Sequence, residues 1–283
     1  MTASTTHGAP TTLAEGFVFA EAPRWHAGEL WVSDMHGEAV HTVSPSGETT
    51  LRLELPGRKP SGIGFLPDGS ALIVSMTERA LLRLAPDGSC SVHARLEALV
   101  ADELNDMVVA PDGTAYVGSY PADPPAGLLL RVRPDGSASV AARDLRFPNG
   151  TVLSADGRTL IVAESKARRF TAFDVDAHGN LGGRRVVATT PDAAPDGMAL
   201  DAEGAIWAGF PLAREFRRVL PGGEVTDRVR VGGRMAIACT LGGPDRRTLF
   251  LTSASEWDAV ELGGAPTSVV ETLRVEVPGT GTP

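Results

Sequence analysis

Cysteine is scarce in this sequence of 283 residues, where only Cys90 and Cys239 are present. The two lie far apart in the chain, so they form no CxxC motif of the kind that holds a metal or carries out redox chemistry. Two cysteines are also too few for a disulfide framework. We therefore expect two buried free thiols.

Long basic runs and long apolar runs are absent as well. No contiguous basic run exceeds a pair such as Arg168-Arg169 or Arg246-Arg247, and the formal net charge is −9. Binding of a polyanion depends on a concentrated basic face, so nucleic acid and an anionic membrane are not expected partners. The chain has no run of 18 apolar residues and no signal-peptide pattern at its start. These features predict a soluble, cytoplasmic protein.

Several catalytic signatures are also missing. The sequence contains no GxSxG elbow, no HExxH motif, no Walker loop and no GxGxxG fingerprint. A serine hydrolase and a nucleotide-dependent enzyme are therefore disfavoured.

Turn formers, by contrast, are abundant, with 32 Gly and 21 Pro in a chain whose residues are 42% hydrophobic. Six segments repeat one pattern, in which a short apolar run, a Gly-containing turn and a second apolar run predict a β-hairpin. The second residues of these segments are separated by 40, 44, 44, 47 and 40 positions. They are Glu21, Ser61, Asn105, Asn149, Asp196 and Ala236.

A second turn follows most of these hairpins, so each repeat contains about four strands. Examples are Pro86-Asp87-Gly88 and Pro134-Asp135-Gly136. Four-stranded units with a period of this length are typical of β-propellers. The sequence therefore predicts an all-β fold, a six-bladed β-propeller with four-stranded antiparallel blades around a central channel. We expect a flexible N-terminal segment at residues 1–14 and a single propeller domain over residues 15–278.

The propeller geometry predicts where the six aligned residues lie. The innermost strand of a blade comes first, so these residues form a ring around the channel at one face of the disc. The loops that follow the second strand of each blade open on the same face. Taken in order, the ring carries a carboxylate, a hydroxyl, two amides, a carboxylate and a methyl group.

Three members of this ring form a candidate metal site, namely Glu21, Asn149 and Asp196. Two carboxylates would repel each other there, and no ring position carries Lys, Arg or His. A bound cation removes the repulsion, and carboxylate and amide oxygens suit a hard ion. We expect one divalent cation, first of all Ca2+, with Mg2+, Mn2+ or Zn2+ as alternatives. The competing interpretation is that Asn149 and Asp196 only form turns, since Pro-Asn-Gly and Pro-Asp-Gly are good turn sequences.

Five motifs resemble, in order and spacing, the regucalcin/gluconolactonase family of six-bladed propellers: AEAPRW, LNDMVVAPDG, FPNGTVLSADG, APDGMALDAEG, and CTLGG followed by LFLTSA. The resemblance covers nearly the whole chain. It implies that Glu21, Asn149 and Asp196 hold one divalent cation in the channel, and that the protein opens lactone rings. It also implies that Asp196 is a candidate general base, and that Asn105 contacts the substrate or lies beside the metal.

One residue departs from the family pattern. Two positions before Asn105, sugar-lactone members typically carry an arginine that contacts the substrate, whereas this chain has Glu103. An anionic or polyhydroxylated sugar lactone loses a partner there, so sugar-lactone specificity is not expected. The alternative interpretation makes Glu103 a solvated loop residue.

The loops after the second strands supply further candidates for substrate binding. Tyr120, Phe210 and Trp257 would make the mouth of the channel apolar, and His36 would add a polar contact. Ordinary packing between blades is the alternative for each. The prolines between Tyr120 and Pro125 predict a stiff flap over the channel.

Together, these features predict a divalent-metal-dependent hydrolase that opens a lactone, or cleaves a related ester, at a cation in the channel. The cation would polarise the carbonyl and activate a water, and Asp196 would accept the proton of that water. The alternatives are organophosphate hydrolysis, a metal-assisted lyase or isomerase step, and a non-catalytic metal-binding platform. The expected partner is a small-molecule lactone or ester.

Overall fold

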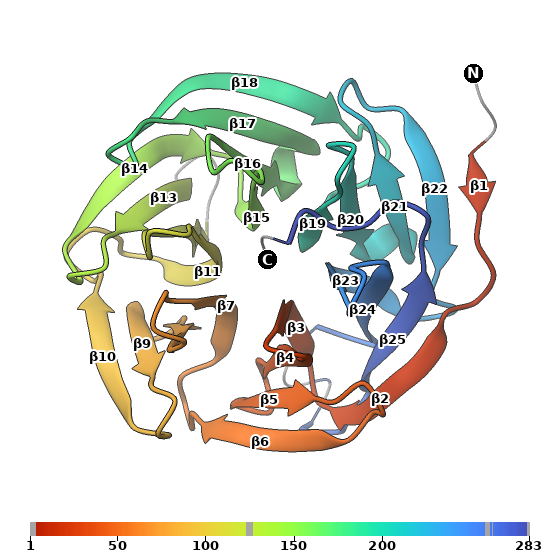
Figure 1. Ribbon diagram of the computed structural model, residues 1–283, viewed down its shortest axis with the longest axis horizontal. Helices are drawn as coiled ribbons and strands as arrows, with labels where there is room; N and C mark the ends of the chain where they lie inside the picture. Colours follow the sequence, from red (N-terminus) through yellow and green to blue (C-terminus); the bar gives the residue numbers. More distant parts are fainter. Residues whose placement is uncertain (1–3, 123–126, 258–260, 262, 282–283) are drawn as a thin grey trace.

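The computed structural model describes residues 4–122, 127–257, 261 and 263–281. These residues form six sheets that stand like blades around a central channel, with almost no helix. Figure 1, viewed along the channel, shows the sheets following one another around the ring. The predicted six-bladed β-propeller is confirmed. The described helices include none that is long and apolar enough to cross a membrane.

Blades 1 to 3 follow one another in the chain, and each runs from its innermost strand to its outermost strand. Blade 1 contains β3 (Ala20–His26), β4 (Glu29–Asp34), β5 (Ala39–Val43) and β6 (Thr49–Glu54). Blade 2 contains β7 (Pro60–Phe65), β8 (Ala71–Ser75), β9 (Ala80–Leu84) and β10 (Cys90–Arg95). Blade 3 contains β11 (Glu103–Val109), β12 (Ala115–Tyr120), β13 (Gly127–Val132) and β14 (Ala138–Leu145).

Blades 4 and 5 each add one turn of 3-10 helix after the second strand. Blade 4 contains β15 (Pro148–Leu153), β16 (Thr159–Glu164), η1 (Ser165–Ala167), β17 (Arg169–Val175) and β18 (Leu181–Thr189). Blade 5 contains β19 (Met198–Leu200), β20 (Ile206–Phe210), η2 (Pro211–Ala213), β21 (Glu215–Val219) and β22 (Val225–Arg230).

Blade 6 is assembled from both ends of the chain. It contains β23 (Met235–Gly242), β24 (Thr248–Ala254), β25 (Ser268–Arg274) and, as its outer strand, β2 (Thr11–Phe17). β2 runs antiparallel to β25, and Phe17 packs with Phe250 and Val270 in the core. Strand β1 (Thr5–Thr6) pairs in parallel with β22 of blade 5. Strands therefore begin within residues 1–14, further toward the N-terminus than the expected boundary.

The inner strands of neighbouring blades lie in direct contact around the channel. A Cβ atom on Gly150 would lie 2.5 Å from the backbone oxygen of Asp196, and one on Gly197 would lie 2.3 Å from the Cβ atom of Ala238. Glycine at these positions permits the close approach of two backbones. The ring is therefore narrow enough for side chains from different blades to meet.

Apolar side chains fill the spaces between neighbouring blades. Leu81 of blade 2, for example, shares one core cluster with Met107 and Val117 of blade 3. Cys239 is buried in such a cluster, but Cys90 is exposed, so the expectation of two buried thiols is wrong for Cys90. Cys90 begins the outermost strand of blade 2, where one edge of the sheet faces solvent.

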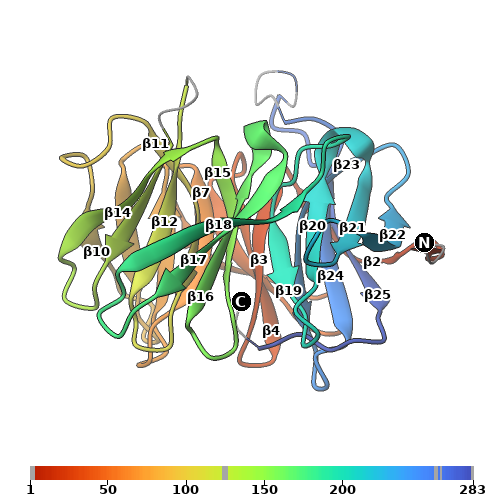
Figure 2. The same cartoon turned by 90° about the horizontal axis from the view of Figure 1, so that it is seen from above.

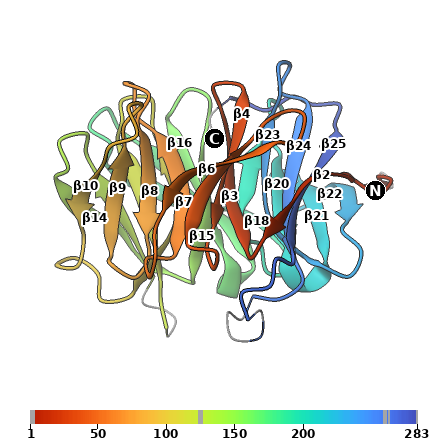
Figure 3. The ribbon, with the colours of Figure 1, turned by 90° about the horizontal axis from the view of Figure 1, so that it is seen from below.

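The two faces of the disc carry different connections. Figures 2 and 3, which view the disc from opposite sides at right angles to Figure 1, show the β3–β4 hairpin at one face. In Figure 2, the helices η1 (green) and η2 (cyan) lie at the other face. The candidate site opens at the face of the two helices, because residues of both line its cavity.

Candidate functional site

The six ring residues lie at irregular points of their inner strands. In β3, β7, β11, β15 and β23 the register with the second strand of the blade shifts at the ring position. In blade 5, Asp196 precedes β19, and its backbone N–H donates to the oxygen of Gly209 at 2.9 Å. Bulges of this kind change the direction of side chains and are frequent beside active sites. The repeated bulge turns the ring side chains toward the channel mouth.

A cavity of about 1150 Å3 opens at this mouth. Four ring residues line it, namely Glu21, Asn105, Asn149 and Asp196. Ser61 is buried just outside the lining, and its hydroxyl donates to Glu21 Oε2 at 3.4 Å. The expected metal ligands are thus brought to one cavity from blades 1, 4 and 5. This volume is slightly above the range of about 300–1,000 Å3 that is usual for cavities that hold small organic ligands.

Burial raises the pKa values of both ring carboxylates. Burial raises the pKa of Glu21 to about 8, with further contributions from the negative charges of Asp196 and Asp106. Burial also raises the pKa of Asp196 to about 7, and Asp106 again adds to the rise. Hydrogen bonds from Asn149 and the backbone of Gly197 oppose the rise at Asp196. The cavity floor therefore favours a positive charge.

Asp106 and Arg24 were not among the residues predicted from the sequence. Arg24 Nη2 lies 2.7 Å from Asp106 Oδ1 and donates to the oxygen of Met107 at 2.8 Å. Both side chains are almost fully buried. Arg24 is therefore occupied by Asp106, and it lowers the pKa of Glu21 only as the smallest of the contributions. The signal in the sequence was a second charged residue in each of two inner strands, Arg24 after Glu21 in β3 and Asp106 after Glu103 in β11.

Asn149 has the contacts expected of a ligand that supplies a carbonyl oxygen. Its Nδ2 atom donates to Ser165 Oγ at 3.3 Å, and Ser165 Oγ donates to the oxygen of Pro195 at 2.7 Å. Its Oδ1 atom is buried and accepts no hydrogen bond. An unpaired buried acceptor is costly unless something positive meets it. Its presence beside two carboxylates fits an oxygen-liganded divalent cation.

This donor set contains only two carboxylates. Within the described ranges, no group of three or more His, Cys, Asp or Glu is arranged to hold a metal ion. The candidate centre therefore depends on the amide oxygen of Asn149 as its third protein ligand. Two acids and an amide suit Ca2+, Mg2+ or Mn2+ better than Zn2+, which more often takes His or Cys.

The predicted substrate-binding residues of blade 3 lie on the wall of the cavity. Asn105 is buried and donates from Nδ2 to the oxygen of Pro148 at 3.1 Å. Glu103 also lines the cavity, and its carboxylate lies 3.7 Å from Lys59 Nζ. The charge of Glu103 is thus partly offset by a neighbouring lysine.

Aromatic side chains form the rim. Tyr120 packs edge-on against Phe147 with ring centroids 4.7 Å apart, and burial together with the charges of Glu21 and Asp196 raises its pKa. His36 Nε2 lies 3.0 Å from the oxygen of Trp257, and both residues line the cavity. Residues 123–126 of the expected flap lie outside the described residues.

Phe210 does not lie where the sequence analysis expected. Its side chain is fully buried in the core between blades 4 and 5, and it is absent from the cavity wall. The guanidinium of Arg217 lies 4.6 Å from its ring centroid. Because side chains alternate between faces along a strand, the last residue of β20 points into the blade. The neighbouring Pro211 and Leu212 line the cavity instead.

Comparison with known proteins agrees with this architecture. A family model described as SMP-30/gluconolactonase/LRE-like region matches residues 19–255. A 6-deoxy-6-sulfogluconolactonase from Pseudomonas putida is 29% identical over 284 residues, covering 94% of both chains. A pentonolactonase from Haloferax volcanii is 26% identical, covering 93% of this chain and 92% of its own. The structure of a calcium-binding protein, regucalcin, from Agrobacterium tumefaciens superposes with a TM-score of 0.85 at 26% identity, covering 99% of both chains.

Proposed function

The chain belongs to the SMP-30/gluconolactonase/LRE-like family, and we propose that it is a lactonase that depends on a divalent cation held by Glu21, Asn149 and Asp196. The observation that carries the proposal is a pair of carboxylates with raised pKa values beside the unpaired Oδ1 of Asn149, at the floor of a large cavity. The two relatives named as lactonases support lactone hydrolysis. The relative named as a calcium-binding regucalcin supports Ca2+ as the ion.

The reaction adds water across the ester bond of the ring. The water oxygen forms a bond to the carbonyl carbon, and the bond from that carbon to the ring oxygen breaks. One water proton passes to the ring oxygen, which becomes a hydroxyl group, and the other leaves with the new carboxylic acid. The product is one open-chain hydroxy acid per lactone and water consumed.

The bound cation would supply Lewis acidity at the carbonyl and a more acidic water. Glu21 Oε2 accepts a hydrogen bond from Ser61 Oγ, and Asn149 Nδ2 donates one to Ser165 Oγ. Such contacts restrict the rotation of the two side chains and would help to orient their oxygens toward a bound ion. Their role in the proposal is to hold the ion.

Asp196 is the residue we assign as general base. Asp196 is a partly exposed residue, whereas Glu21 is buried and only 8% exposed. A general base has to come within hydrogen-bond reach of the attacking water, so access decides between the two. Asn105, on the cavity wall beside them, is the candidate to contact the substrate.

The experiment removes metal with a chelator and restores Ca2+, Mg2+, Mn2+ and Zn2+ one at a time. Turnover of aliphatic, aromatic and sugar lactones is then compared for the wild type, Asn149→Ala and Asp196→Asn, with metal affinity measured by calorimetry. Asp156→Asn is a matched control, because Asp156 lies in an exposed hairpin at the opposite face. Metal-restored turnover that is lost in both site variants supports the proposal. Tight metal binding without turnover of lactones, esters or phosphotriesters would indicate a binding platform.

A further inference from the structure

Four cationic residues line the cavity although the chain has a net charge of −9. Lys59 is paired with Glu103 at 3.7 Å. Arg146, Lys166 and Arg168 have no carboxylate partner among the described residues. All three come from the segments on either side of the β15–β16 hairpin of blade 4, and we call them the blade 4 cationic edge. The edge adds positive charge to the wall of a cavity whose floor is acidic.

The backbone beneath the blade 4 cationic edge is held in place. Lys166 N–H donates to the oxygen of Arg146 at 3.1 Å, and Ser165 N–H donates to the oxygen of Phe147 at 3.1 Å. Arg146 N–H donates to the fully buried carboxylate of Glu164 at 2.8 Å. Two segments that are separate in sequence therefore present their cations together. Sites built on a backbone constrained in this way are pre-organised for a ligand.

The cationic groups keep most of their hydrogen-bonding capacity. Lys166 Nζ lies 5.2 Å from the centroid of the Phe147 ring, and Arg168 uses Nη1 to donate to the oxygen of Pro191 at 2.8 Å. Lysine carries three donors and arginine five, and neither has an acceptor. A sugar hydroxyl needs acceptors as well as donors, whereas an anionic group needs donors alone. The chemistry of the edge thus favours an anion over further hydroxyl groups.

We propose that the blade 4 cationic edge binds a negatively charged group, a carboxylate, sulfonate or phosphate, at the end of the lactone remote from the ester. This inference rests on the proposed function and narrows its substrate class to anionic lactones. The charged group takes no part in the reaction, so the balance of water addition is unchanged. The sequence indicates that an anionic lactone has no arginine partner where this chain carries Glu103. In this proposal, cations from blade 4 take the place of that arginine.

The test uses lactones of one six-carbon sugar acid that differ only at C6, with hydroxyl, carboxylate, sulfonate or phosphate there. The variant carries Arg146→Gln and Lys166→Gln together, and Arg158→Gln is the control, since Arg158 is an exposed blade 4 arginine outside the cavity lining. We expect the wild type to prefer at least one anionic lactone. The double variant should raise KM for that lactone about tenfold, with little change in kcat, because two exposed charge contacts are lost.

Binding of the open-chain product acids gives a second readout that is independent of turnover. Calorimetry should show that the acid with the charged C6 group binds the wild type more tightly than gluconate, and that this preference shrinks in the double variant and at high salt. Equal affinity and equal kcat/KM for neutral and charged compounds would overturn the anion site while leaving the lactonase intact. Charge-dependent binding without turnover of any lactone would instead contradict the proposed function and keep the anion site.

Discussion

Buried carboxylates occur in the blades and at the channel mouth, and the two regions differ in whether these carboxylates form ion pairs. In the blades, four buried carboxylates each lie within 4 Å of at least one arginine side chain, whereas buried Asp34 accepts the backbone N–H groups of Val18, Phe19 and Gly37 instead. The pairs are Glu164 with Arg169 and Arg184, Asp201 with Arg218, Glu215 with Arg217 and Arg228, and Glu271 with Arg234. At the channel mouth, Glu21 and Asp196 form no ion pair within the described chain.

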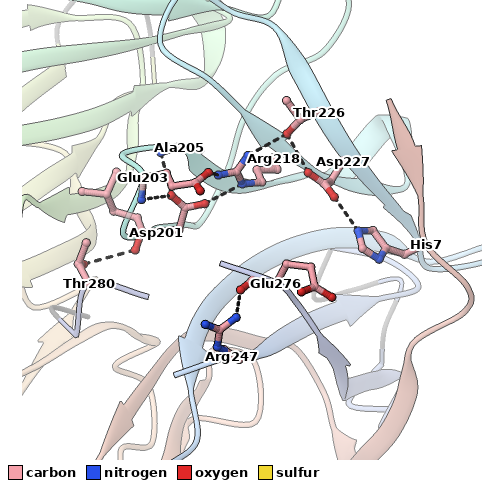
Figure 4. Close-up of polar contacts among 11 residues, drawn as sticks. His7, Asp201, Glu203, Ala205, Arg218, Thr226, Asp227, Arg247, Glu276 and Thr280 are labelled. Atoms are coloured by element: carbon pink, nitrogen blue, oxygen red, sulfur yellow. Dashed lines mark hydrogen bonds and ion pairs between the residues drawn. The ribbon is translucent and has the colours of Figure 1, made fainter. Parts of the chain in front are cut away.

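Blade 5 shows the paired arrangement most fully (Figure 4). Arg218 Nε lies 2.7 Å from Asp201 Oδ2, and its Nη2 lies 2.8 Å from Glu203 Oε2. Asp201 also accepts the backbone N–H groups of Glu203 and Ala205, each at 3.0 Å. Every oxygen of Asp201 thus has a partner, which leaves no position for a ligand.

The comparison separates structural acids from candidate functional acids. An uncompensated buried charge costs several kcal/mol. A buried acid without an ion-pair partner is therefore either protonated or neutralised by a group from outside the chain. The paired acids of the blades are occupied by arginine partners, and removing one partner would leave the other as an unpaired buried charge. The unpaired acids of the channel are available to a cation, and their raised pKa values reflect burial without an ion-pair partner.

The largest effect is expected when the charge of Asp196, one of the two channel acids, is removed. Asp196→Asn is expected to lower kcat/KM for lactones about 1000-fold, because both a proposed ligand and the proposed base are lost. The melting temperature of the metal-free protein should stay the same or rise, since a desolvated charge disappears. Steady-state kinetics and thermal unfolding of the same preparation test both parts. A metal-free protein that is destabilised by this change would contradict the unpaired state of Asp196.

Removing a paired acid from a blade should lower the stability of the fold and leave the activity nearly unchanged. Asp201→Ala leaves Arg218 buried without its main partner, which typically costs about 3–5 kcal/mol. Urea unfolding should show this loss, and kcat/KM per folded molecule should change little. Asp201→Asn, which preserves the shape and some hydrogen bonds, should cost less. A large fall in activity with unchanged stability would instead indicate that Asp201 has a role in function.

The paired acids of the blades and the unpaired acids of the channel should also differ in how they make the stability of the fold depend on pH. Burial alone disfavours the charge on Glu164, but hydrogen bonds from Arg169, Thr171 and the backbone of Arg146 outweigh it and hold its pKa below the usual value. Its contribution is therefore complete above the pKa of the unfolded chain and is lost as pH falls through the lower folded pKa. Glu164→Gln should flatten the acid limb of the stability curve. An unchanged acid limb in this variant would show that Glu164 is not held ionised.

The smallest effect is expected from Ser61, whose hydroxyl donates a hydrogen bond to the proposed ligand Glu21. Ser61→Ala removes one hydrogen bond of 3.4 Å to Glu21 and leaves the carboxylate in place. Metal affinity should fall about threefold, which is the value of one weak hydrogen bond. Calorimetry of wild type and variant measures the change. A loss of 100-fold or more would mean that Ser61 is itself a ligand.

The sequence was sufficient for the blades and for the ring, because hairpins that recur every 40 to 47 residues place one residue per blade at the channel. It could not show that β2 from the N-terminus closes blade 6, because Thr11–Phe17 lies outside the repeat and pairs across the whole chain. It also missed Arg24 and Asp106, whose pairing depends on contact between two blades rather than on spacing. Phe210 was misplaced because a loop position does not determine which way a side chain points.

The blade 4 cationic edge shows the same limit at the cavity wall. In the sequence, Lys166 and Arg168 are two residues of a short basic stretch, and Arg146 lies in a different segment. Only the backbone hydrogen bonds between the two segments bring them to one place. The composition shows that the chain as a whole is acidic, but it could not predict that cationic side chains gather at one cavity.

Diffraction from crystals soaked in Mn2+, with anomalous data collected, tests the central claim most directly. The account predicts a single strong anomalous peak at the channel mouth, within bonding distance of oxygens from Glu21, Asn149 and Asp196, and no such peak in Asp196→Asn crystals. No peak among these three side chains in the wild type, with the carboxylates turned away from each other, would contradict it.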